Sequence, residues 1–189
     1  MTENYLIRHA QAEGNTAAHL QREVQSARST AADLWDAPFD AARDREYYID
    51  CYADAWRTAH GNLEHFSPET YFSAARRHQM HFPGSVLRMY RGEEAAGLVD
   101  MDPERGAEKG IGWISLLYLK EQYRNKGYGI QLLARAVIFY RDHNRSCLRL
   151  QAAEQNGIAL RFYQREGFHC VGEQKGADGK LLVMEKPLV

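Results

Sequence analysis

The chain has 189 residues, and 44% of them are hydrophobic, which is enough to bury the core of one folded domain. A formal net charge of −1 at pH 7 argues against a general attraction to nucleic acid or to an anionic membrane. No apolar stretch reaches membrane-spanning length and no leader-like segment opens the chain, so we expect a cytoplasmic protein. The three cysteines, Cys51, Cys147 and Cys170, lack metal-ligand spacing, and we expect reduced thiols and no metal site.

The start of the chain differs in character from the remainder. Residues 5–15 read Tyr-Leu-Ile-Arg-His-Ala-Gln-Ala-Glu-Gly-Asn and resemble the opening strand and turn of the histidine phosphatase family, in which an Arg-His-Gly turn carries the phosphate-accepting histidine. Ala10 stands in place of that glycine, and no phosphatase body follows. We therefore interpret residues 1–31 as an N-terminal appendage, either a truncated phosphatase-like remnant or an unrelated strand and helix. Residues 32–189 form the main domain in this interpretation.

The next segment predicts a short strand and two helices. The strand covers residues 34–39, and Asp40 or Asp44 is suited to cap the helix after it. The apolar face of this helix repeats at spacings of four and three, through Tyr48, Tyr52, Ala55, Trp56 and Ala59. Gly61 ends the helix, and Ser67 caps the next one, with proline in its first turn.

Strands and helices alternate in the rest of the chain. Apolar runs separated by turn signals predict a hairpin and a third strand, at residues 86–90, 95–101 and 111–119. A long amphipathic helix then has Ile130, Leu133, Val137 and Tyr140 on its buried side. The last predicted elements are a strand at 147–151, a helix at 157–166, and strands at 168–173 and 181–185.

The most informative stretch joins the third of these strands to the long helix. Residues 122–129 read Gln-Tyr-Arg-Asn-Lys-Gly-Tyr-Gly, a basic turn with two glycines. Glycines let the main chain approach a ligand closely, N–H groups at a helix N-terminus point outward, and the helix dipole favours negative charge. Arg124 and Lys126 add positive charge, so the pattern predicts a diphosphate site.

A second block further along the chain strengthens this prediction. A short strand at 148–150 precedes Asn156, Ala159, Phe162, Tyr163 and Gly167-Phe168. Together the two blocks resemble the GCN5-related N-acetyltransferase (GNAT) family, whose members move an acetyl group from acetyl-CoA to an amine. The resemblance implies an α/β (α+β) fold, a mixed and mostly antiparallel sheet of about six to seven strands flanked by about four helices. It also implies acetyl-CoA as co-substrate, a small-molecule or peptide amine as acceptor and, as one option, a homodimer.

The resemblance assigns roles to individual residues. Backbone groups of Leu117, Tyr118 and Leu119 would pair with the pantetheine amides, and the N–H near Leu117 would polarise the thioester carbonyl. The diphosphate would bind Arg124, Asn125, Lys126, Gly127, Tyr128 and Gly129. Asn156 would bond the pantetheine arm. Tyr163, with a phenol pKa near ~10, would protonate the departing thiolate.

Two carboxylates are candidates for the base that deprotonates an amine of pKa near ~10.4. Glu154 precedes the Asn156 helix, and Asp100 lies on a strand next to residues 111–119. The alternative for each is a solvated surface carboxylate. Tyr118 and Trp113 would either line the acceptor pocket or fill the core. We predict Tyr163 and Glu154 as the catalytic pair.

Two other functions stay open at this point. A non-catalytic acyl-CoA sensor would keep the cofactor loop and have no base. A phosphate-transfer or phosphate-binding role would use Arg8 and His9. The acceptor itself is not specified, because the two helices after the first strand carry no portable motif.

Overall fold

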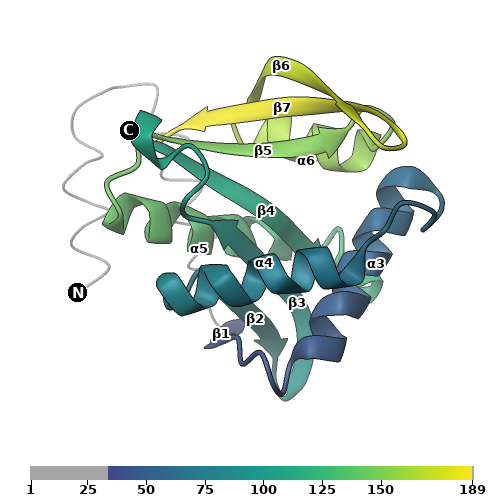
Figure 1. Ribbon diagram of the computed structural model, residues 1–189, viewed down its shortest axis with the longest axis vertical. Coiled ribbons are helices and arrows are strands. Elements are labelled where there is room, and N and C mark those ends of the chain that lie inside the picture. Colours follow the sequence, from purple (N-terminus) through teal and green to yellow (C-terminus); the bar gives the residue numbers. More distant parts are fainter. Residues whose placement is uncertain (1–33, 189) are drawn as a thin grey trace.

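The fold is built around one seven-stranded sheet with helices on both faces (Figure 1). The computed structural model describes residues 34–188. The strand order is β1-β2-β3-β4-β5-β7-β6, and every neighbouring pair is antiparallel except β4 and β5. The strands are β1 (Trp35–Pro38), β2 (Val86–Arg91), β3 (Glu94–Asp102), β4 (Ile111–Leu119), β5 (Cys147–Ala153), β6 (His169–Gly176) and β7 (Gly179–Pro187). The helices are α3 (Arg45–His60), α4 (Pro68–His81), α5 (Tyr128–Asp142) and α6 (Gly157–Arg165), with 3₁₀ turns η1 (Ala107–Lys109) and η2 (Glu121–Tyr123). The predicted mixed, mostly antiparallel sheet with flanking helices is confirmed.

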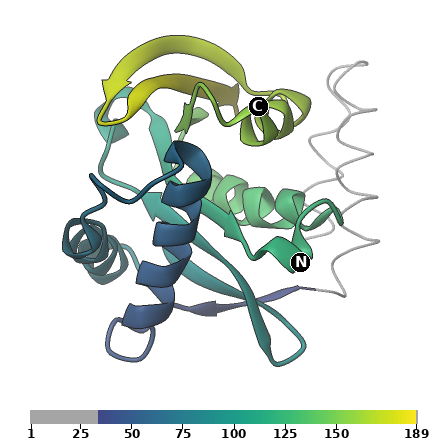
Figure 2. The ribbon, with the colours of Figure 1, turned by 90° about the vertical axis from the view of Figure 1, so that its right-hand side faces the viewer.

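Alternating side chains divide the interior into two layers. On β3, Leu98 packs in the layer with α3 and α4, whereas Val99 packs in the layer with α5, because neighbouring strand residues point to opposite faces. Figure 2 shows α5 on the far side of the sheet from α3 and α4. Tyr48 and Tyr140 are fully buried, one in each layer. Burial of each such ring contributes roughly 1.5–3 kcal/mol.

The feature that positions the site is the divergence of β4 from β5. Their parallel pairing ends where Ile114 lies opposite Leu150. On its other side, β4 carries one extra residue, Ser115, relative to β3. Such a bulge bends the strand that carries it. The C-terminal half of β4 therefore leaves β5 and exposes one backbone edge inside the sheet (Figure 1).

Two of the predicted helix caps are at the predicted positions but do not make the capping hydrogen bond. Asp44 and Ser67 take the N-cap positions of α3 and α4, but neither side chain bonds a backbone N–H of its helix. The Asp44 carboxylate instead binds the Arg88 guanidinium, and the Ser67 hydroxyl bonds that of Thr70. The end of α3 is as predicted, because Gly61 adopts the left-handed region at φ 78°.

The buried side of α5 is rotated relative to the prediction. Ile130 and Val137, predicted to be buried, are only partly so, whereas Leu132 and Ala136 lie in the core. The reason is that α5 packs against the sheet and also against α6, so its apolar face is wider than one stripe.

The phosphatase-like segment, residues 1–31, lies outside the described residues. Within residues 34–188, no helix is long and apolar enough to cross a membrane. Over the same range, no group of three or more His, Cys, Asp or Glu side chains is arranged to hold a metal ion.

Candidate active site

The loop between β4 and α5 is shaped by two residues in the left-handed region. Asn125 has φ 59° and Gly127 has φ 81°, and Gly127 occupies the N-cap position of α5. No side chain caps this helix start within the described part of the chain. Backbone N–H groups around left-handed residues form a concave anion site, and the helix dipole adds partial positive charge. The geometry of this loop suits a diphosphate.

Arg124, the first residue of the glycine motif, turns its side chain away from this loop. Its Nε donates to the Leu119 carbonyl at 2.8 Å, and its guanidinium pairs with Asp54 of α3 at 2.9 Å. Asp54 also accepts a hydrogen bond from the Tyr118 hydroxyl at 2.8 Å. Arg124 therefore ties the loop to α3, and the exposed Lys126 is left to bring side-chain charge to an anion.

The last two residues of the motif serve packing. Tyr128 is buried in the core, and its ring lies edge-on to Tyr123. A Cβ at Gly129 would lie 3.0 Å from the ring of Phe162, so this glycine lets α6 close onto the start of α5. A ligand of this loop would therefore meet Tyr128 and Gly129 through their main chain.

The exposed backbone edge of β4 belongs to Leu117 and Leu119. A Cβ at Gly97 of β3 would lie 2.3 Å from the Tyr118 carbonyl oxygen, so the polar groups of Tyr118 face β3. Successive residues of an antiparallel strand alternate in direction, so the N–H and C=O of Leu117 face the opening toward β5. A carbonyl or amide in that opening would find hydrogen-bond partners on β4.

Helix α6 presents Asn156 and Tyr163 beside the core layer that contains α5. The Asn156 carboxamide oxygen accepts from the Ala159 N–H at 3.2 Å and caps the helix, which leaves the Nδ2 donor for another partner. The Tyr163 ring is partly buried and packs against Phe162 and Phe168. Burial raises the pKa of the Tyr163 phenol to about 12, so the hydroxyl is protonated at neutral pH.

Residues 45–168 match the Acetyltransferase (GNAT) family. The chain belongs to this family. Among solved structures, it is similar to Ard1 from Thermoplasma volcanium, with 16% identity, 83% of this chain and 99% of that chain covered, and a TM-score of 0.67. It is also similar to the PaiA N-acetyltransferase from Thermoplasma acidophilum in complex with coenzyme A, with 20% identity, coverage of 82% and 98%, and a TM-score of 0.64. A third is a putative phosphinothricin N-acetyltransferase, with 18% identity, coverage of 82% and 99%, and a TM-score of 0.67. At these identities the similarity shows the fold, and no curated protein matches the chain.

In this GNAT domain, the two candidate bases have different surroundings. Glu154 directly follows β5, is about half exposed, and pairs with Lys180 at 3.1 Å. Asp100 is buried and bonds the Tyr48 hydroxyl at 2.7 Å and His78 Nδ1 at 3.0 Å. Asp100 therefore holds α3 and α4 against β3, and of the two carboxylates Glu154 alone is open to an acceptor.

Helix α3 contacts both of the diverging strands, β4 and β5. The Tyr52 hydroxyl donates to the carbonyl of Ser115, the bulge residue, at 3.3 Å. Two turns later, His60 lies 4.0 Å from Asp178 in the turn between β6 and β7, measured from Nδ1 to Oδ2. Trp56 lies between them in the sequence, and its ring centroid is 4.4 Å from that of His60.

Sequence reasoning missed Asp54, His60 and Asp178. Asp54 bonds Tyr118, which is 64 residues away, and Asp178 bonds His65, which is 113 residues away. A helical spacing of four does link Tyr52, Trp56 and His60, and that spacing was the available signal. Trp113, by contrast, lies in the core and carries the Arg105 guanidinium over its ring.

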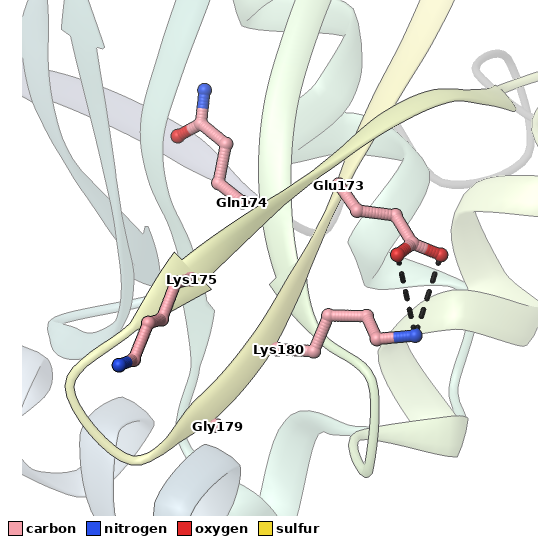
Figure 3. A pocket seen from close by; sticks show the side chains of 5 residues that line it. All are labelled: Glu173, Gln174, Lys175, Gly179 and Lys180. Carbon is pink, nitrogen blue, oxygen red and sulfur yellow. Dashed lines mark hydrogen bonds and ion pairs between the residues drawn. The ribbon is translucent and has the colours of Figure 1, made fainter.

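A shallow hollow of about 400 Å³ lies elsewhere, on the β6–β7 hairpin (Figure 3). Its lining residues are all exposed, namely Glu173, Gln174, Lys175, Gly179 and Lys180. Lys180 pairs with Glu173, and Figure 3 shows the two side chains facing one another. The hollow contains none of the predicted site residues.

Proposed function

We propose that this protein is an N-acetyltransferase that moves an acetyl group from acetyl-CoA directly to a primary amine in a ternary complex. The observation that carries the proposal is the alignment of two features on one end of β4. The strand leaves β5 after Ile114, and the loop after it starts α5 with an uncapped, left-handed turn. A pantetheine amide chain in the opening and a diphosphate on the loop would form one continuous ligand site.

The proposed cofactor contacts are mostly made by the main chain. The Leu117 N–H would polarise the thioester carbonyl and the Leu119 N–H would continue the edge, whereas the predicted main-chain contact of Tyr118 does not fit, because its polar groups face β3. The Nδ2 of Asn156 would donate to the pantetheine arm. The diphosphate would lie on the loop residues Arg124, Asn125, Lys126, Gly127, Tyr128 and Gly129. A coenzyme A complex of a protein with this fold supports the choice of ligand.

Tyr163 is the proposed general acid. A proton donor must be protonated before the thiolate departs, and the burial that raises the pKa of Tyr163 ensures this. Its hydroxyl has no hydrogen-bond partner among residues 34–188, which leaves it available to a ligand sulfur. Glu154 is the proposed base, since it follows the strand end at which β4 and β5 diverge.

Tyr163→Phe tests the catalytic part of the proposal. We expect kcat for coenzyme A release to fall on the order of 100-fold, with the affinity for acetyl-CoA measured by calorimetry nearly unchanged. Tyr90→Phe is a matched control, because Tyr90 stacks on Trp35 at the β1 edge of the sheet. Equal activity of Tyr163→Phe and wild type would remove Tyr163 from the mechanism.

The second candidate function is a non-catalytic acyl-CoA sensor. The observation that favours it is the ion pair of Glu154 with Lys180, because this pair engages the carboxylate that would otherwise act as the base. A sensor would bind acetyl-CoA and release no coenzyme A with any amine. Turnover by the wild-type protein that is lost in Glu154→Gln would exclude it.

A further inference from the structure

The contact between α3 and the β6–β7 turn contains buried polar atoms that have no hydrogen-bond partner among residues 34–188. They are the indole nitrogen of Trp56, Nδ1 of His60 and Oδ2 of Asp178. The side chain of His60 is 8% exposed and that of Asp178 is 12% exposed. Each buried polar atom without a hydrogen bond costs about 1–3 kcal/mol of free energy, so a cluster of three would be stabilised by a bound polar ligand.

The acceptor atoms and the charge of the cluster determine which ligand would fit it. One oxygen of Asp178 is already bonded to His65 Nδ1 at 2.7 Å, and the other is the unpartnered acceptor. Burial lowers the pKa of His60, so its ring is neutral at pH 7, and in the tautomer with the proton on Nε2 the Nδ1 atom is an acceptor. An N–H donor at ordinary hydrogen-bond distance from both atoms would sit about 2 Å to the side of the line joining them. A positively charged ammonium group satisfies both and neutralises the buried carboxylate.

The cluster lies on the same face of α3 as the contact with the β4 bulge, two turns further along the helix. Tyr52, Trp56 and His60 follow one another at a spacing of four on α3, from the bulge carbonyl of Ser115 to Asp178. Eight residues of helix measure about 12 Å. Figure 1 shows the β6–β7 turn next to the C-terminal end of α3. A molecule with a reacting amine at the diverging strands could therefore reach Asp178 with a second group.

We propose that Asp178 and His60 bind a second, cationic group of the acceptor, so that the preferred acceptors are amines with two positive charges separated by on the order of 10 Å. This inference rests on the proposed N-acetyltransferase function. One ammonium binds Asp178 and stays protonated, while the other gives one proton to Glu154 and its neutral nitrogen attacks the thioester carbon. The nitrogen–carbon bond forms and the carbon–sulfur bond breaks. The nitrogen then releases a second proton to water, and the thiolate takes up a proton from Tyr163 to leave as coenzyme A.

The test compares α,ω-diaminooctane with octylamine, which has the same chain and one amine. For the wild-type protein, we expect KM of the diamine to be at least about ten-fold lower than KM of octylamine. Asp178→Asn keeps the size of the side chain and removes its charge, and it should raise KM of the diamine about ten-fold while changing KM of octylamine less than two-fold. Glu185→Gln is the matched control on the same hairpin, where the carboxylate binds Arg149 of β5, and it should leave both values unchanged.

Several results would overturn the inference. They are equal KM values for the two amines with wild type, an equal effect of Asp178→Asn on both amines, or acetylation of other amines but not of the diamine. Calorimetry with coenzyme A and a melting curve show whether Asp178→Asn is folded, and His60→Gln provides a second variant. Failure of wild type to acetylate any amine, with coenzyme A still bound, would instead refute the proposed function.

Discussion

The buried histidine on α4 gives a quantitative prediction about stability and pH. Burial by itself would lower the pKa of His78, but hydrogen bonds and charge interactions with Asp100 and Asp102 outweigh it and raise the pKa to about 9 from 6.5. His78 Nδ1 lies 3.0 Å from Asp100, and Nε2 lies 3.6 Å from Asp102. The charged imidazolium therefore stabilises the packing of α4 on β3 at neutral pH.

The sign of the pH dependence is set by the raised pKa. The folded protein binds this proton more tightly than the unfolded chain, so the extra stability is fully present below pH 6.5, falls as the pH rises, and is lost above about pH 9. Since one pKa unit corresponds to about 1.36 kcal/mol, the full contribution is roughly 3 kcal/mol. The side chain is 3% exposed, so solvent screening does little to reduce this value.

The assay is urea unfolding of wild type and His78→Gln at pH 6 and at pH 9.5. We expect the free energy of unfolding of wild type to exceed that of the variant by about 2–3 kcal/mol more at the lower pH than at the higher one. His81→Gln is the matched control, because His81 lies on the same helix but is about half exposed beside Glu104. A difference between wild type and His78→Gln that is the same at both pH values would refute the reasoning.

Three further changes test other parts of the molecule. Gly127→Ala puts a side chain at φ 81°, which costs roughly 1–2 kcal/mol for an L residue, so the free loop should relax and the coenzyme A affinity measured by calorimetry should fall about ten-fold. An unchanged affinity would argue against binding at this loop. Gly112→Ala would bring its Cβ within 2.4 Å of the Tyr140 ring, so we expect a lower melting temperature or loss of soluble protein, and a wild-type melting curve would contradict the packing described. Deletion of residues 1–31 should leave coenzyme A affinity unchanged, whereas a phosphatase activity that disappears on deletion would support the alternative based on Arg8 and His9.

The order and type of the elements were predictable because each leaves a local signal. The run from Ile111 to Leu119 is apolar except for Ser115 and is bounded by polar loops, and the structure places β4 over the same residues. The start of α5 was predictable from Gly127, which needs the left-handed region at the helix start. The capping hydrogen bonds of Asp44 and Ser67 do not form, because both side chains bond other side chains instead of the backbone.

The side-chain partners of the site could not be predicted in the same way. Arg124 is part of a recognisable motif, yet its guanidinium binds Asp54, 70 residues away, instead of extending over the loop. Asp100 and Glu154 were both candidates for the base, with Glu154 preferred, and only the tertiary structure separates a buried bridge between α4 and β3 from an exposed residue at a strand end. Such pairings depend on the register of β3 and on the position of α3 across the sheet, and neither is encoded in a short window.

The two halves of the proposed site would therefore use different kinds of groups, main-chain groups for the cofactor and side chains for the acceptor. The cofactor half uses main-chain groups of β4 and of the α5 start, so it needs the strand divergence, a glycine at 127 and few particular side chains. A TM-score of 0.67 to a protein of 16% identity shows that the fold persists while most side chains differ. The proposed acceptor half would use side chains of α3 and of the β6–β7 turn, above all His60 and Asp178. The acceptor of this protein therefore has to be inferred from its own residues at that contact and cannot be transferred from relatives that share only the fold.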